Sequence, residues 1–138
     1  MFVEELVVVT ARWVVDLDTA LLAAGGPRVL VFRAGCSYRQ RLEAILAARG
    51  ISGARRLEFG TLDGIVGCVA AGVGVTLLPR AVVEPAWREG RVNLHALPAA
   101  EAKVTTVLVR RRDAYISSAL DAFLRAIRGD RPLAAAAE

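Results

Sequence analysis

The stretch that most constrains this chain is residues 57–80, LEFGTLDGIVGCVAAGVGVTLLPR. Its pattern predicts a strand that ends at Phe59, a helix over residues 61–71 and a second strand that Pro79 closes. Four apolar residues recur at helical spacing in its middle part: Leu62, Ile65, Val66 and Val69. They give the helix one apolar face that must be covered. Thr61 is predicted to cap the first free amides of this helix, with Asp63 in its positive first turn. Gly72 stands where a left-handed helix terminator is expected. Such strand–helix–strand units build parallel sheets.

A second strand and helix precede this unit. Residues 28–32, RVLVF, are predicted to form a short strand whose last four residues are continuously apolar, which is typical of a central parallel strand. The motif GCSYRQ follows, and in it Ser37 and Gln40 have the spacing of a capping box, which predicts that a helix begins there. We expect Gly50 to end that helix and residues 54–59 to form the next strand.

The remaining elements are predicted from similar signals. Residues 1–10 carry an apolar run and form a buried strand, and the abrupt start suggests a piece of a longer protein. The other expected elements are helices over residues 16–24, from 80 to about 87 and from 113–117 to 128, strands over 91–97 and 104–110, and a plain linker over 98–102. We expect Gly129 to terminate the last helix and residues 130–138 to be a flexible tail.

Composition restricts the class of protein. A chain of 138 residues that is 55% hydrophobic, with a mean hydropathy of +0.45, is large enough for one domain with a proper core. The net charge is +4, but every basic residue except Lys103 is an arginine, as a GC-rich coding bias would produce. The charge alone is therefore weak support for nucleic-acid binding, and the run at residues 110–112 is predicted to be a solvated turn.

The sequence gives little support for a catalytic site, a metal site or a membrane-spanning segment. Cys36 and Cys68 fit neither a disulfide framework nor a metal site, and His95 is the single histidine, so no metal or cofactor is expected. A position at a helix start would make the Cys36 thiol more reactive. The need for a small residue where the backbone approaches closely explains the presence of this cysteine equally well. No catalytic residue is assigned. The N-terminal apolar run is too short to span a bilayer and lacks the features of a signal peptide, so a cytoplasmic location is expected.

The two helix starts form the candidate binding site. In a parallel sheet both lie at the carboxyl edge, where open α/β folds hold ligands, and both present free amides and positive dipole ends. We expect an anionic or polar small ligand between Ser37 and Thr61. Arg39 would add a charge-assisted contact and Tyr38 an aromatic wall. The alternative is that each helix simply needs a cap and binds nothing.

The motifs above resemble a known family. Residues 33–127 look like the effector-binding domain of LysR-type transcriptional regulators, through GCSYR at a helix start, LEFGTLDGIVGCVAAGVGVTLLPR, and TTVLVRRRDAYISSALDAFLRAI. The N-terminal VEELVVVT resembles the strand that crosses into the second subdomain. The resemblance implies an α/β sandwich of the periplasmic-binding-protein-like (type 2) fold, with a mostly parallel sheet. It also implies a small effector in the cleft between two subdomains.

The same likeness assigns parts of the chain to that architecture. Residues 1–12 would be the crossing strand, 13–98 the second subdomain nearly complete, and 99–129 the return strand and C-terminal helix of the first subdomain. The implied effector contacts, with Arg39 added from the charge argument, are Cys36, Ser37, Tyr38, Arg39, Gly60 and Thr61. Family members often carry His-Pro after the first strand, whereas this chain has Ala11-Arg12-Trp13. We therefore expect Trp13 either to be partly exposed or to pack on a surface that the missing part of the protein would cover.

The likeness also implies partners. Full-length members bind promoter DNA through an N-terminal winged helix-turn-helix, which this chain lacks, and they assemble as dimers or tetramers. The leading hypothesis is a ligand-sensing regulatory domain that is homo-oligomeric and contacts DNA only through the missing domain. Two alternatives stay open: an assembly fragment that binds no ligand of its own, and a solute-binding protein of the same fold.

Overall fold

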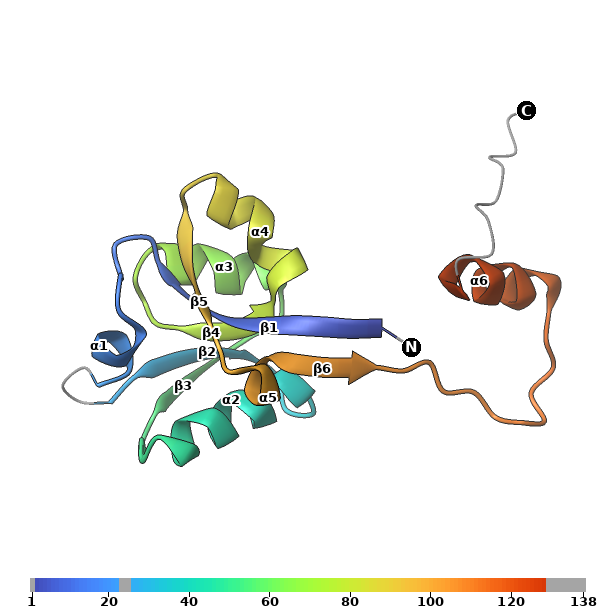
Figure 1. The fold of residues 1–138 in the computed structure, drawn as a ribbon, viewed down its shortest axis with the longest axis horizontal. Coiled ribbons are helices and arrows are strands. Elements are labelled where there is room, and N and C mark those ends of the chain that lie inside the picture. The colour runs from blue at the N-terminus through green and yellow to red at the C-terminus, as the bar shows by residue number, and fades with distance from the viewer. Residues whose placement is uncertain (1, 23–25, 129–138) are drawn as a thin grey trace. The chain divides into compact units, whose positions relative to one another are not determined.

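The computed structural model describes residues 2–22 and 26–128. The chain divides into two compact units, Met1–Val107 and Leu108–Glu138. In the first unit helices lie on both sides of a central sheet (Figure 1). These helices are α1 (Leu17–Leu21), α2 (Ser37–Ala48), α3 (Leu62–Ala70), α4 (Arg80–Arg88) and α5 (Ala99–Ala102).

The first strand, β1 (Phe2–Ala11), is the centre of the main sheet. It pairs along one side with β4 (Thr76–Pro79) and along the other with β5 (Val92–Ala96). Its first residues pair with β6 (Lys103–Thr106), and all three ladders are antiparallel. Residues 6–11 of β1 are buried, as the apolar run requires.

A parallel pair extends this sheet. In it, β2 (Arg28–Phe32) and β3 (Arg55–Phe59) run in register, from Arg28 opposite Arg55 to Phe32 opposite Phe59. The amide of Leu30 donates to the carbonyl oxygen of Val75 at 2.8 Å, so β2 also meets the residue that precedes β4. The strands therefore follow one another in the order β3, β2, β4, β1, β5.

The expectation of a mostly parallel sheet is wrong for the pairing of β1. The strands joined by helices, β2, β3 and the entry to β4, are parallel, because a strand–helix–strand connection returns the chain in the same direction. However, β1 inserts antiparallel between β4 and β5. Local sequence patterns predict the relative direction of two strands that one helix connects. They do not predict where a distant strand inserts into the sheet.

Two hydrophobic cores lie on the two faces of the sheet. Leu6 and Val8 of β1 belong to the core under α1 and α2, whereas Val7 and Val9 belong to the core under α3 and α4. This division follows from the strand geometry, because successive side chains point to opposite faces. The apolar stripe predicted for residues 61–71 is confirmed, since Ile65, Val66 and Val69 are buried in the second core.

Several predicted boundaries change in the structure. The first helix begins after Asp16, whose carboxylate accepts from the Thr19 amide, and residues 23–25 of its expected end lie outside the described residues. The expected linker over 98–102 is wrong, because α5 forms there from alanine-rich sequence after a proline. The strand expected to reach residue 110 ends at Thr106, which is opposite Phe2 near the start of its partner β1.

The second unit contains one helix within the described residues, α6 (Ser118–Arg128). The Ser117 hydroxyl accepts from the Leu120 amide at 3.2 Å, so the start lies just beyond the predicted range of 113–117. The arginines at 110–112 are exposed, as predicted. Gly129 and the tail predicted over 130–138 lie outside the described residues, and the assignment of 99–129 to a first subdomain stays a prediction.

Candidate functional site

The two predicted helix starts lie at one edge of the sheet. β2 ends at Phe32 and β3 ends at Phe59, and these two residues are partners in the parallel ladder. Four residues lead from Phe32 into α2, and two residues lead from Phe59 into α3. Both helices therefore leave from neighbouring strands at the carboxyl edge, which is the arrangement that the ligand hypothesis needs.

The start of α3 is capped as predicted. Thr61 is the N-cap in an extended conformation, and its Oγ1 accepts from the Gly64 amide at 3.2 Å. Asp63 lies in the first turn, where its charge complements the helix dipole. Gly60 and Thr61 are exposed, so their backbone is open to a ligand.

The capping box predicted at the start of α2 is wrong. The N-cap is Cys36, with no side-chain hydrogen bond to the helix, and Ser37 is already the first helical residue. The reason is that the first helical hydrogen bond runs from the Gln40 amide to the Cys36 carbonyl, which moves the helix start one residue earlier. Ser37 is exposed, and the free amides of this first turn have no side-chain cap from Cys36.

The side chain of Tyr38 points toward β1. Its hydroxyl donates to the Glu4 carboxylate at 2.9 Å, and its ring packs on the core under α2. Burial, together with the neighbouring Glu4, raises the pKa of Tyr38 to about 12. The Tyr38 side chain thus joins α2 to the central strand β1.

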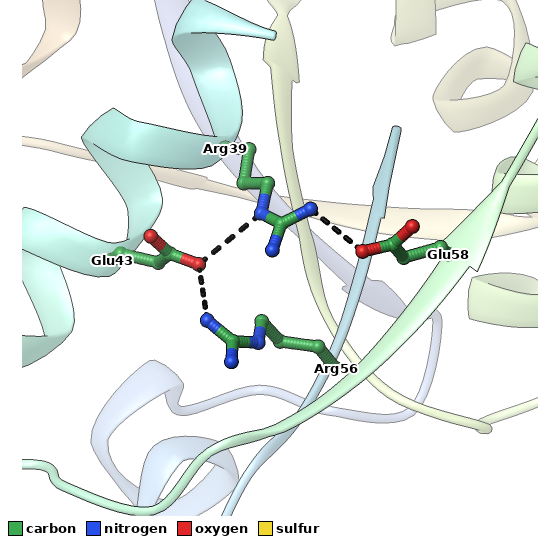
Figure 2. Close-up of polar contacts among 4 residues, drawn as sticks. All are labelled: Arg39, Glu43, Arg56 and Glu58. Atoms are coloured by element: carbon green, nitrogen blue, oxygen red, sulfur yellow. Dashed lines mark hydrogen bonds and ion pairs between the residues drawn. The ribbon is translucent and has the colours of Figure 1, made fainter. Parts of the chain in front are cut away.

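Arg39 is held by two carboxylates (Figure 2). Its Nε lies 3.3 Å from Glu43 Oε1 and its Nη1 lies 2.7 Å from Glu58 Oε1, while Arg56 Nη1 lies 3.0 Å from the same Glu43 oxygen. Arg56 and Arg39 lower the pKa of Glu43 through these contacts. Because Glu58 adjoins the end of β3, the pair with Arg39 links the first turn of α2 to the strand that leads into α3.

Sequence reasoning missed Arg33, which follows β2. A methyl group built on Gly60 would lie 3.8 Å from Arg33 Nη2, so this guanidinium lies beside the loop between β3 and α3. Among the described residues it forms no ion pair. The sequence signal that could have identified Arg33 is its position directly after the end of a strand.

The remaining candidates lie elsewhere or support no chemistry. His95 in β5 has its Nε2 2.8 Å from Thr10 Oγ1, and burial lowers its pKa. Cys36 and Cys68 are free thiols. Within residues 2–22 and 26–128 no cluster of His, Cys, Asp and Glu has the makings of a metal site, and no helix there combines the length and apolar character that a membrane span needs.

Comparison with known proteins gives a consistent family. The family described as the LysR substrate binding domain matches residues 4–131. The uncharacterized HTH-type transcriptional regulator YusT of Bacillus subtilis is 43% identical over 123 residues, which are 89% of this chain but 40% of YusT. The chain spans less than half the length of the curated relatives that it matches.

Two solved structures show the same fold. The effector-binding domain of QuiR in complex with shikimate aligns with a TM-score of 0.66 at 21% identity, over 88% of this chain and 58% of that one. The regulatory domain of Synechocystis CcmR in complex with 2-PG aligns with a TM-score of 0.67 at 14% identity, over 94% of this chain and 64% of that one. At these identities the likeness shows the fold alone, which is the predicted α/β fold of LysR-type effector-binding domains.

Proposed function

Because this chain belongs to the family of LysR substrate-binding domains, we propose that it is the ligand-sensing part of a transcriptional regulator that binds DNA through another segment. YusT carries the name of a helix-turn-helix regulator and is more than twice as long as the matched stretch. A bound effector would favour one arrangement of the domains over another, and so alter DNA binding. The family is one of regulator domains and not of enzymes.

We propose that the effector is a small anionic metabolite held at the two helix starts. The observation that carries this proposal is the adjacency of Phe32 and Phe59, which brings two positive helix ends to one edge. The fold relatives QuiR and CcmR are complexed with the small molecules shikimate and 2-PG. Exposed backbone at Gly60 and Thr61 would bind the anion on one side, and Cys36 and Ser37 would bind it on the other.

The charged side chains divide into two roles. Arg33 lies beside Gly60 without an ion pair among the described residues, so it is the better placed cation for a ligand. Arg39 would first have to exchange its contact with Glu58, and we propose that it positions α2 relative to β3 in the absence of ligand. Tyr38 would hold the same helix through Glu4.

A thermal-shift titration of the 138-residue chain tests this function, with shikimate and a panel of small hydroxy and amino acids as probes. A ligand at 100 times its dissociation constant adds about 2.7 kcal/mol of stability. We expect Arg33→Gln to weaken the response about tenfold, which corresponds to 1.4 kcal/mol for one charged contact. The matched control is Arg88→Gln, which makes the same charge change on α4.

A chain that responds to no ligand would favour the second candidate function, which is that of an assembly fragment. Val3 of β1 is 69% exposed and Val107 is 57% exposed, and such apolar surface on one unit favours association with another protein surface. A folded chain that responds to no probe, but sediments as a dimer at high concentration, would support assembly without sensing. A monomer that responds to a ligand would support sensing.

A further inference from the structure

A hollow lies at the opposite end of β2 and β3 from the helix starts. Its volume is about 390 Å³, which is within the range of small-molecule sites. We call it the arginine hollow, and the residues that matter here are Trp13, Arg28, Arg55, Gly72 and Val73. Arg28 and Arg55 begin the two strands, and a strand of five residues spans about 13 Å, so the hollow is separate from the candidate effector site.

Two like charges face each other at this hollow. Arg28 and Arg55 are direct partners in the parallel ladder, and neither forms an ion pair with a carboxylate of the described residues. Residues 23–25, next to the rim of the hollow in sequence, are Ala-Ala-Gly and carry no charge. Like charges opposite one another on neighbouring strands repel, and an anion between them would remove that repulsion.

An aromatic side chain borders the same hollow. Trp13 is 61% exposed, and a methyl group built on Gly72 would lie 2.7 Å from its Cζ2, so the indole rests on the turn that ends α3. Arg28 lies on the same sheet face as Leu30, which packs beneath α3, because alternate residues of a strand share a face. The indole and the two guanidinium groups are therefore on one side of the sheet.

We propose that the arginine hollow binds a small aromatic carboxylate. Its carboxylate would accept charge-assisted hydrogen bonds from Arg28 and Arg55, since guanidinium groups match the planar geometry of carboxylates. Its ring would stack on Trp13, which is now largely open to solvent. The site stands independently of the proposed effector site, and a ligand here would join the end of β1, the start of β2 and β3, and the turn after α3.

Fluorescence of Trp13 tests this proposal directly. In the variant Trp87→Phe, Trp13 is the only tryptophan of the chain. We expect a saturable change in its emission on titration with benzoate. The neutral analogue benzamide, of nearly the same shape, should bind at least about tenfold more weakly, because it cannot form the ionic contacts. Equal responses to both compounds, or no saturable response to benzoate below about 10 mM, would overturn the proposal.

Variants in the same Trp87→Phe background locate the site. Arg28→Gln combined with Arg55→Gln should weaken benzoate binding by at least about tenfold, and Arg55→Gln alone serves if the double variant does not give the circular-dichroism spectrum of the parent. Arg88→Gln and Thr61→Val should leave the response unchanged. A response that survives in the arginine variants, or that disappears with Thr61→Val, would assign binding to another place and refute the arginine hollow as its site.

Discussion

Replacing Gly74 with alanine tests how the chain passes from α3 into β4. A methyl group at this position would lie 2.3 Å from the Arg28 carbonyl oxygen and 2.6 Å from Cδ1 of Leu30. The same carbonyl accepts a hydrogen bond from the Val75 amide at 2.9 Å. The neighbour is therefore backbone held within the sheet, and it cannot move away without opening the bridge between β2 and the entry to β4.

The expected cost of Gly74→Ala follows from these contacts. Overpacking of a close contact costs about 1–3 kcal/mol. Losing the two backbone hydrogen bonds of the Val75 bridge adds about 1 kcal/mol for each. We expect the free energy of unfolding to fall by about 3 kcal/mol or more, and for a unit of this size the Tm would fall by about 12 °C.

Gly67→Ala is the matched control in the same motif. Gly67 lies in the middle of α3, and a methyl group there would meet nothing within 4 Å. Because alanine is the better helix former by about 1 kcal/mol, this variant should raise the Tm by about 4 °C. Both changes are measured by thermal and urea denaturation followed by circular dichroism. A Gly74→Ala variant within about 0.5 kcal/mol of the parent protein would refute the close approach of β2 to this glycine.

Three further predictions concern single side chains. Thr61→Ala should cost about 1 kcal/mol through loss of the α3 cap, while Thr61→Ser, which keeps the hydroxyl, should cost much less; urea denaturation distinguishes them. The pKa of Tyr38 is raised to about 12, so its contribution to stability is present below about pH 10 and is lost as the pH rises toward 12. Stability of Tyr38→Phe should therefore fall less steeply over that range, and parallel curves would contradict the contact with Glu4. Burial lowers the pKa of His95, against a smaller opposing effect of Asp16, so its contribution is present above about pH 6.5 and is lost as the pH falls. His95→Gln should show a weaker loss of stability between pH 7 and 5, and an unchanged loss would count against the burial of this ring.

Signals that are local in sequence predicted local structure well. The strand over 28–32 has the predicted bounds, Thr61 caps α3, and Gly72 has the positive φ of +78° that a helix terminator needs. Each of these depends on residues within one turn or one strand. The insertion of β1 between β4 and β5 was not predictable in this way, because its partners lie about 70 to 90 positions later in the chain.

Two features near the helix starts differ from a simple interpretation of the sequence. Ser37 had the spacing of an N-cap, yet the N-cap is Cys36, one residue earlier, so that Ser37 is the first residue of the helix. The contact of Arg39 with a ligand stays a prediction, and in the structure Arg39 pairs with Glu43, one helical turn away, and with Glu58 of β3. Only the sheet register brings Glu58 close, so the sequence around Arg39 does not reveal this partner.

The charges around Arg39 decide what the candidate effector site can attract. Arg39 and Arg56 carry two positive charges, and Glu43 and Glu58 carry two negative ones, so this group of four residues is neutral as a whole (Figure 2). Attraction for an anion must then come from the two helix ends, each equivalent to about half a positive charge, and from Arg33. An anion that binds Arg39 tightly enough to displace Glu58 would leave the Glu58 carboxylate without its partner. It would thereby loosen the link between α2 and β3. The same exchange that binds the ligand more tightly would thus change how the two helix starts are held together.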